Sequence, residues 1–405
     1  IPAGTFAGAG FTSISLPSGA GLVIGETAFA GSALESVSLG GNIAGVGAGA
    51  FSGCPELKSA TIGATRLEMH AFANSPKLAS VSLTGLTSVP ATAFALCKEL
   101  AEVSGTESLT AIGDQAFAGC TALENFSFGP ALKSIGTGAF ESTGLKMANM
   151  QGCKALSTIG ARAFSNDASL ESASLPEGLS ELGEGSFFNC PTLTEVSLPE
   201  DMTEIPAYAF KGDAALNISD VLHDGVATVG NYALKDMTGV KDVIIPESLE
   251  YLGDGAMEGM TGLEKLNVHQ VTSVPELGKN VWKGIDQSEV ELHVLSTMSE
   301  DFADADQWRD FKFMISTGIN TIENPSGADG AGIEGRFHGS ELQLRSRGTD
   351  IEKVDLYQTS GALALSATPR STEANIATEG VQGHIFVVEC TLSNGSRAAL
   401  KLVRR

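Results

Sequence analysis

The chain has 405 residues, a hydrophobic content of 42% and a net charge of −23. It is therefore long enough for two domains or a repeat array, and too apolar to be disordered. Nucleic acid and anionic lipid are poor partners for such a chain, because phosphate binding requires clustered Lys and Arg. No apolar run approaches the roughly 18 residues that cross a bilayer, so we expect no membrane-spanning segment.

A phenylalanine recurs every 21 to 24 residues along most of the chain. We name these positions anchors: Phe6, Phe29, Phe51, Phe72, Phe94, Phe117, Phe140, Phe164, Phe187 and Phe210, followed by Leu234 and Met257. An aliphatic residue lies five positions before each anchor, mostly Gly lies four before, and mostly Ala one before. Such a period predicts a solenoid of about 12 to 13 repeats of ~23 residues, in which neighbouring coils bury each anchor. Because Ile1 already fills an inward slot, we expect a leader or further repeats upstream.

Each repeat contains an alternating segment such as Leu193–Leu198, which predicts a strand with one buried face. Strands of successive repeats should stack as a parallel sheet, and an extended piece running into a tight turn should complete each coil. The outward strand position is usually small and polar. We consider the following residues candidates for binding a partner: Ser38, Thr61, Ser82, Ser104, Ser127, Asn149, Ser174, Ser197 and Asn267.

This ladder of small polar residues has two interpretations. The hydroxyls could hydrogen-bond a protein or glycan, or small side chains could simply pack best on a closely stacked sheet. Aromatic residues make up only 6% of the chain and mostly occupy the anchor positions. Because glycan and protein hot spots favour exposed aromatics, binding at any one repeat should be weak and depend on several repeats together.

The positions of the six cysteines do not indicate a framework of disulfide bonds. Cys54, Cys97, Cys120 and Cys190 each follow an anchor by three residues, a repeated slot that suggests a small buried side chain. Asp167 and Asp213 take the same slot in other repeats, where a side chain could tie down loop backbone. We therefore expect free thiols.

The repeat pattern weakens toward residue 313. Trp282 fits the anchor of a thirteenth unit, and the acidic stretch 299–313 should be helical and cover the last repeat. We predict a solenoid over 1–313 with a cap over about 291–313, a linker over 314–333, and a small antiparallel β-sandwich over 334–405. Its predicted strands are 341–346, 352–357, 362–366, 384–392 and 397–403, with turns at Ser360-Gly361 and Asn394-Gly395.

The repeat string resembles the BspA-like leucine-rich repeat family of bacterial surface proteins. Residues 112–117 (Ile-Gly-Asp-Gln-Ala-Phe) with 120–123 (Cys-Thr-Ala-Leu) are a close example. The resemblance covers about residues 1–313 and implies a curved leucine-rich-repeat solenoid, a location outside the cell or on the outer membrane surface, and adhesion to host or bacterial surface proteins.

The tail is similar to the C-terminal sorting domain of the type IX secretion system of Bacteroidetes. The matching positions are 354–357, Ser360-Gly361, Gly383, 385–388, Gly395 and 401–405. The resemblance implies export across the outer membrane. His384 stands where that family usually has an aromatic residue.

The sequence shows no group of residues arranged for catalysis. The six histidines recur at no regular spacing from one another or from acidic residues. His-Glu-x-x-His, Cys-x-x-Cys and phosphate-loop motifs are absent. We expect no cofactor and no metal site. The sequence thus predicts a non-enzymatic secreted or cell-surface protein that binds host or bacterial proteins, or glycans, through its solenoid. The alternative is a spacer that presents another module at the cell surface.

Overall fold

The computed structural model describes residues 1–16, 21–41, 43–64, 66–316, 333–338, 341–346, 348–358, 363–378, 381, 385–394 and 397–403. The contacts divide the chain into two units. One contains Ile1–Val294 and Met298–Met314, and the other contains Leu295–Thr297 and Ile315–Arg405.

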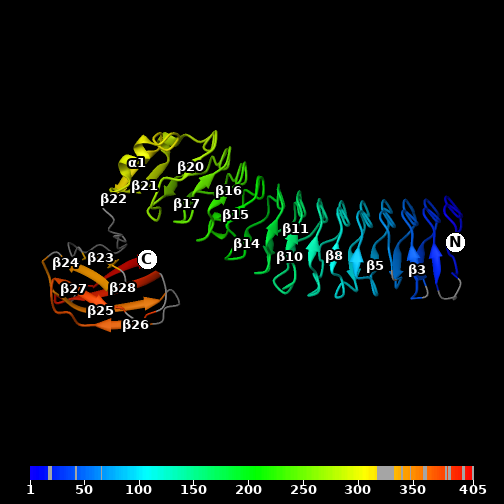
Figure 1. The fold of residues 1–405 in the computed structure, drawn as a ribbon, viewed down its shortest axis with the longest axis horizontal. Coiled ribbons are helices and arrows are strands. Elements are labelled where there is room, and N and C mark those ends of the chain that lie inside the picture. Colours follow the sequence, from blue (N-terminus) through cyan, green and yellow to red (C-terminus); the bar gives the residue numbers. More distant parts are fainter. Residues whose placement is uncertain are drawn as a thin grey trace. The chain divides into compact units, whose positions relative to one another are not determined.

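The first unit is the predicted solenoid of stacked repeats (Figure 1). Its first sheet consists of the alternating segments, paired in parallel between successive repeats. Among the described residues it runs in three segments. These are β2 (Ser36–Leu39), β4 (Ser59–Ile62), β5 (Ser80–Ser82) and β7 (Glu102–Ser104); β10 (Met147–Asn149), β12 (Ser172–Ser174) and β14 (Glu195–Ser197); and β17 (Asp242–Ile244), β19 (Lys265–Asn267), β21 (Glu291–Leu295) and β22 (Lys312–Ser316).

A second parallel sheet is built from the short extended pieces before the anchors. Its strands are β1 (Leu22–Ile24) and β3 (Ile43–Val46); β6 (Ser88–Val89), β8 (Ala111–Ile112), β9 (Ser134–Ile135), β11 (Thr158–Ile159) and β13 (Glu181–Leu182); and β15 (Glu204–Ile205), β16 (Thr228–Val229), β18 (Tyr251–Leu252) and β20 (Glu276–Leu277). Each piece runs into turns that carry the anchor, as predicted. Two 3₁₀ turns, η1 (Ile218–Asp220) and η2 (Gln287–Glu289), lie in the later repeats.

The anchors form one stacked column inside the solenoid. From Phe29 to Phe210 each anchor phenylalanine is fully buried. Neighbouring rings lie face to face with centroids 5.1 to 5.6 Å apart. Leu234, Met257 and Trp282 continue the column as buried residues. The prediction that neighbouring coils bury the anchors is confirmed from Phe29 onward, whereas Phe6 in the first repeat is half-buried.

At positions 160 and 183, each four residues before an anchor, glycine is required by a close approach between coils. A Cβ built on Gly183 would lie 2.3 Å from the backbone nitrogen of Ala161, and one on Gly160 would lie 2.6 Å from that of Thr137. Real Cβ atoms do not approach backbone this closely, so larger residues would separate the coils. The requirement at these two positions is therefore space, and no left-handed backbone is involved.

The cysteines are free and buried, as predicted. Burial raises the pKa of the Cys97 thiol to about 12, and the thiolate is the reactive form. We therefore expect the folded protein to resist a thiol reagent, and all six thiols to react when urea is added. The measurement is the rate of thiol modification with and without denaturant, and fast modification in native buffer would contradict the burial.

The end of the solenoid differs from the predicted helical stretch. The helix α1 covers only Ser299–Asp304, and the chain leaves it at Ala305 with an extended backbone. The rings of Trp308 and Phe311 then pack edge-on against Trp282, with centroids 5.2 and 5.1 Å away. Burying these rings favours turns over a continued helix. The strand β22 follows and joins β21.

The second unit contains two small antiparallel sheets. One has the strand order β23 (Ile333–His338), β24 (Glu341–Ser346), β27 (Glu373–Ala377), and the other has β26 (Leu363–Ala367), β25 (Ile351–Gln358), β28 (Ile385–Leu392), β29 (Arg397–Val403). Their inward residues share one core, to which Leu344 and Ile376 contribute from the first sheet and Leu356 and Val388 from the second. The predicted β-sandwich is thereby confirmed.

Within this unit, β23 and β27 are strands that the sequence pattern missed. The predicted turn at Ser360-Gly361, together with Gly383, His384 and Gly395, lies outside the described residues. The predicted linker over 314–333 overlaps β22 at its start and β23 at its end.

Candidate binding surface

The first segment of the first sheet brings four of the candidate residues side by side. Parallel pairing places Ser38 opposite Thr61, Thr61 opposite Ser82, and Ser82 opposite Ser104. These side chains are exposed or half-buried, while Val37, Ala60 and Val81 on the same strands point into the core. The period of two therefore produces the expected ladder of small polar side chains.

Further along, the second segment aligns Asn149 with Ser174 and Ser174 with Ser197. In the third segment Asn267 lies between Ile244 and His293, so the ladder of small polar residues ends there. The Asn267 side chain accepts a hydrogen bond from the backbone N–H of His269 at 2.9 Å.

Ser127 is exposed but does not belong to a strand, which corrects the predicted strand in that repeat. Phe126 and Phe128 fill the inward slots that hold smaller residues in neighbouring repeats. The Phe126 ring packs edge-on between Phe117 and Phe140, at 5.3 and 5.0 Å. The bulk of these rings holds the segment away from the strand ladder, and the Ser127 carbonyl instead accepts a hydrogen bond from the Thr106 hydroxyl at 2.7 Å.

A second outward column of residues, which was not predicted, lies beside the predicted one. Because side chains alternate, the residue two positions earlier on each strand also faces outward. In the first segment these residues are Ser36, Ser59, Ser80 and Glu102. The alternation of inward and outward residues that predicted the first column also predicts this second one.

Between the two columns lies an open groove of about 470 Å³. Its floor and walls come from β4, β5 and β7, and its polar lining residues are Ser59, Thr61, Ser80, Ser82, Glu102, Ser104 and Asn125. The Ser82 hydroxyl hydrogen-bonds the Thr84 hydroxyl at 3.0 Å. The small side chains leave the backbone of the sheet accessible to a partner.

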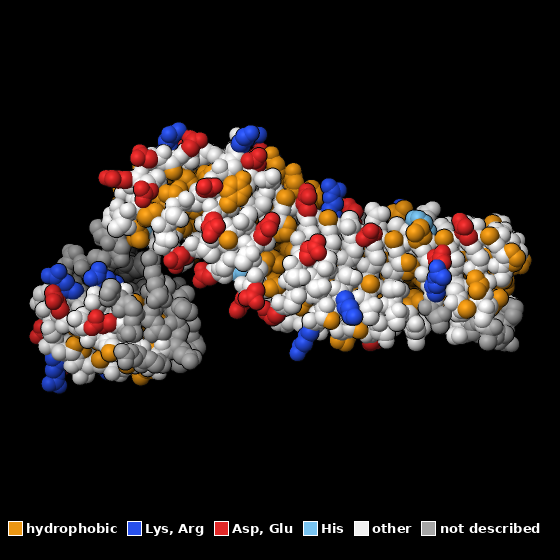
Figure 2. All heavy atoms as spheres, viewed as in Figure 1, with side chains coloured by type: hydrophobic (Ala, Val, Ile, Leu, Met, Phe, Trp, Pro, Cys, Tyr) orange, Lys and Arg blue, Asp and Glu red, His pale blue; other side chains and the backbone are white. Residues whose placement is uncertain are grey.

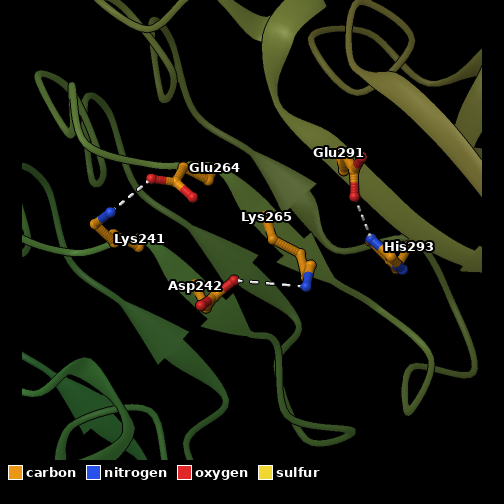
Figure 3. A network of polar contacts seen from close by, with 6 residues as sticks. All are labelled: Lys241, Asp242, Glu264, Lys265, Glu291 and His293. Carbon is orange, nitrogen blue, oxygen red and sulfur yellow. Dashed lines mark hydrogen bonds and ion pairs between the residues drawn. The ribbon is translucent and has the colours of Figure 1, made fainter. Parts of the chain in front are cut away.

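Toward the last repeats, charged side chains replace the small polar ones on the outward face of the first sheet. Ion pairs there join side chains of neighbouring coils (Figure 3). Lys241 binds Glu264 at 2.8 Å, and Lys265 approaches Asp242 at 3.9 Å. Figure 2 likewise shows more carboxylates over the half of the solenoid toward β20 than over the half toward β3. Exposed pairs of this kind contribute little stability but present fixed charge to a partner.

Two histidines meet on this charged part of the face. The ring of His269 lies edge-on to that of His293, with centroids 6.2 Å apart. Nε2 of His293 contacts Glu291 at 3.0 Å, and this hydrogen bond lowers the pKa of Glu291. Burial, and next the neighbouring His293, lower the pKa of His269. Within the described residues, no group of three or more His, Cys, Asp or Glu could hold a metal ion.

A separate aromatic cluster lies on the turns that carry the anchors. Tyr208 and Tyr232 occupy the same slot in successive repeats and stack at 5.3 Å. The Lys211 ammonium lies 5.5 Å from the Phe188 ring and 5.8 Å from the Tyr208 ring. These aromatic residues are half-buried and therefore offer aromatic surface to a partner away from the sheet face where partners were predicted to bind.

Comparisons with known proteins agree with this architecture. The chain matches the family described as BspA type Leucine rich repeat region (6 copies) over residues 1–103, 87–217, 157–289 and 213–324. No curated protein matches the chain. No helix among the described residues is long and apolar enough to span a membrane.

Several of the solved structures to which the chain is similar come from bacteria. A leucine-rich repeat protein from Bacteroides ovatus ATCC 8483 is 22% identical, with a TM-score of 0.48, covering 73% of this chain and 88% of that one. A leucine rich cell surface protein from Faecalibacterium prausnitzii A2-165 is 22% identical, with a TM-score of 0.39 and coverages of 62% and 83%. The pneumococcal vaccine antigen PcpA is 16% identical, with a TM-score of 0.42 and coverages of 70% and 80%.

Proposed function

Because the chain belongs to the BspA-type leucine-rich repeat family, we propose that it is a non-enzymatic binding protein located outside the cell or on its surface. Its solenoid binds host or bacterial surface proteins, or glycans, on the outward face of the first sheet. One observation carries this proposal most strongly. In a chain of net charge −23, the outward positions of β2, β4 and β5 hold only Ser and Thr, in register.

The physical reason for choosing this face is desolvation. Removing water from carboxylates and ammonium groups is costly, whereas hydroxyls exchange water for a partner's hydrogen bonds at little net cost. The groove over β4, β5 and β7 gives a partner contact with both the hydroxyls and the floor of the sheet. Weak contacts repeated on neighbouring coils add up when one partner spans several of them.

Arginine substitutions within the groove test the proposal. The double variant Thr61→Arg and Ser82→Arg should weaken capture of extracellular-matrix or bacterial surface proteins by about tenfold or more, a loss of at least ~1.4 kcal/mol. The matched control is Thr121→Arg with Thr137→Arg, which adds the same charge at exposed turn positions. Melting temperatures should be unchanged in both, since exposed substitutions rarely alter stability by more than about 0.5 kcal/mol.

The same experiment separates binding from the spacer alternative. If the solenoid only holds another module away from the surface, neither double variant changes the amount or identity of the captured protein. Equal capture by the wild type, both variants and an unrelated acidic protein would therefore remove the support for adhesion.

The second unit supports a further division of roles within this proposal. Residues 1–313 form the binding solenoid with its cap over about 291–313, and residues 334–405 form an export domain that resembles the type IX sorting domain. We expect deletion of 334–405 to retain the protein inside the producing cell. Immunodetection on intact cells measures this, and undiminished surface display after the deletion would exclude the sorting role.

A further inference from the structure

The slot three residues after each anchor forms a polar column inside the solenoid. In five repeats its side chain donates a hydrogen bond to the carbonyl oxygen of the preceding anchor. The Cys54 thiol donates to Phe29 at 3.3 Å, the Cys97 thiol to Phe72 at 3.2 Å, the Cys120 thiol to Phe94 at 3.2 Å, the Cys190 thiol to Phe164 at 3.1 Å, and the Ser75 hydroxyl to Phe51 at 3.1 Å.

Asp167 and Asp213 occupy this slot as fully buried residues. Oδ1 of Asp167 accepts from the backbone N–H and the hydroxyl of Thr143, at 2.6 and 3.0 Å. Oδ1 of Asp213 accepts from the N–H of Cys190 at 2.7 Å. These bonds confirm that the carboxyls hold loop backbone, as the sequence suggested. Oδ2 of both residues is buried and has no partner within the described part of the chain.

A second anomaly occurs in the coils that precede these two residues. By the register of the column, Asp167 and Asp213 correspond to the carbonyls of Phe140 and Phe187. Among the described residues, these two carbonyls receive no hydrogen bond, whereas each other phenylalanine anchor from Phe6 to Phe210 has a donor. Buried carbonyls without a donor are rare, so two of them beside two unpartnered carboxyl oxygens call for a common explanation.

We propose that Asp167 and Asp213 are neutral carboxylic acids in the folded solenoid, donating the Oδ2 proton to the carbonyls of Phe140 and Phe187. A single proton on each carboxyl gives both Oδ2 and the anchor carbonyl a hydrogen-bond partner. The acid O–H then takes the place of the thiol or hydroxyl that donates in other repeats. Loss of that proton would turn a donor into an anion facing a carbonyl oxygen. The stability of the central repeats therefore depends on pH.

The surroundings of the two carboxyls favour the neutral form. The Glu141 carboxylate acts on Asp167, and both carboxyls act on the buried Cys190 thiol. Neither carboxyl forms an ion pair with a Lys or Arg in the described part of the chain. Burial raises the pKa of Asp167 to about 8, against the opposing hydrogen bonds from Thr143, and burial raises that of Asp213 well above its usual range.

The sign of the pH effect follows from these directions. An unfolded Asp ionises near pH ~3.9, so between about pH 4 and about pH 8 the folded state keeps protons that the unfolded state has lost. Stability falls with rising pH wherever the folded state binds more protons. The two residues should therefore make the solenoid most stable in acid and progressively less stable toward pH ~8.

Urea unfolding of the full chain at several pH values tests the proposal. The variant Asp167→Asn with Asp213→Asn keeps a donor and an acceptor without the titration, so its unfolding midpoint should fall much less than the wild type's between about pH 5 and about pH 8. The control Asp301→Asn with Asp310→Asn makes the same two side-chain replacements at exposed positions and should follow the wild type. Parallel midpoints for all three proteins would overturn the proposal.

Infrared spectroscopy provides a measurement that does not depend on the variants folding. The wild type at about pH 6 should show the carbonyl stretch of protonated carboxylic acids, which free carboxylates have lost at that pH. This band should disappear in alkali. Its absence from the folded wild type at about pH 6 would overturn the proposal even if the asparagine variants were unstable.

Discussion

Replacing Phe140 by Ala should lower the free energy of unfolding by about 3–5 kcal/mol. The ring is fully buried and lies 5.4 Å from both Phe117 and Phe164, each nearly parallel to it. The backbones of neighbouring coils are joined by hydrogen bonds on both sides, such as Phe117 N to Ala139 O and Phe140 N to Ala163 O, each 2.8 Å. The coils therefore cannot close the cavity.

Chemical denaturation measures this loss, and Leu96→Ala is the control. Leu96 is a large apolar residue on the same series of turns, but it is 50% exposed, so its truncation should change stability by less than about 0.5 kcal/mol. Similar losses for the two variants would mean that the column of rings is not a packed core.

Replacing Gly183 by Ala should cost about 3 kcal/mol, the upper end of the usual range for overpacking. The new Cβ would meet the Ala161 nitrogen and the Gly160 carbonyl carbon at 2.3 and 2.4 Å. Both are backbone atoms of the preceding coil, so no side-chain rotation can relieve the clash. The hydrogen bond from Gly183 N to Ile159 O, 2.8 Å long, would have to lengthen.

Gly152→Ala is the matched control for this prediction, measured by the same unfolding experiment. A Cβ at Gly152 meets nothing within 4 Å, and its backbone is not in the left-handed region. The control should be neutral or slightly stabilising, because alanine restricts the unfolded chain. If Gly183→Ala were as stable as this control, the close approach between coils would not explain the glycine slot.

The binding face was only partly predictable. The alternation of Ser36 to Leu39 and its counterparts indicated one outward column correctly, and it also contained the second column. What alternation could not indicate is where the ladder is interrupted. Ser127 fits the alternating pattern of the sequence. However, Phe126 is larger than the Val or Ala of its slot in neighbouring repeats, and Phe128 is larger than the Gly or Met of its slot there. Only the packing of these rings against Phe117 and Phe140 reveals the consequence.

In the second unit, the alternation of apolar and polar residues predicted the strands less completely. The strand β24 has three buried apolar or small residues in alternation and was predicted with its observed bounds. The strand β27 has only Ala374 and Ile376 pointing inward, and it is a strand because it pairs along β24 from Glu341 to Arg345. A strand that depends on its neighbour for hydrogen bonds leaves little signal in its own residues.

The period, the buried slots and the parallel stacking could be predicted from the residues, because each repeat meets the same neighbours and so the same residue types recur. The tertiary structure alone decided which backbone atoms the coils present to one another. The contact between Gly183 and Ala161 and the pairing of Asp167 with a carbonyl one coil away depend on the stacking register between repeats. That register exists only once the coils have assembled. The closest contacts between coils involve main-chain atoms, which every residue type has, so the residue types do not reveal it.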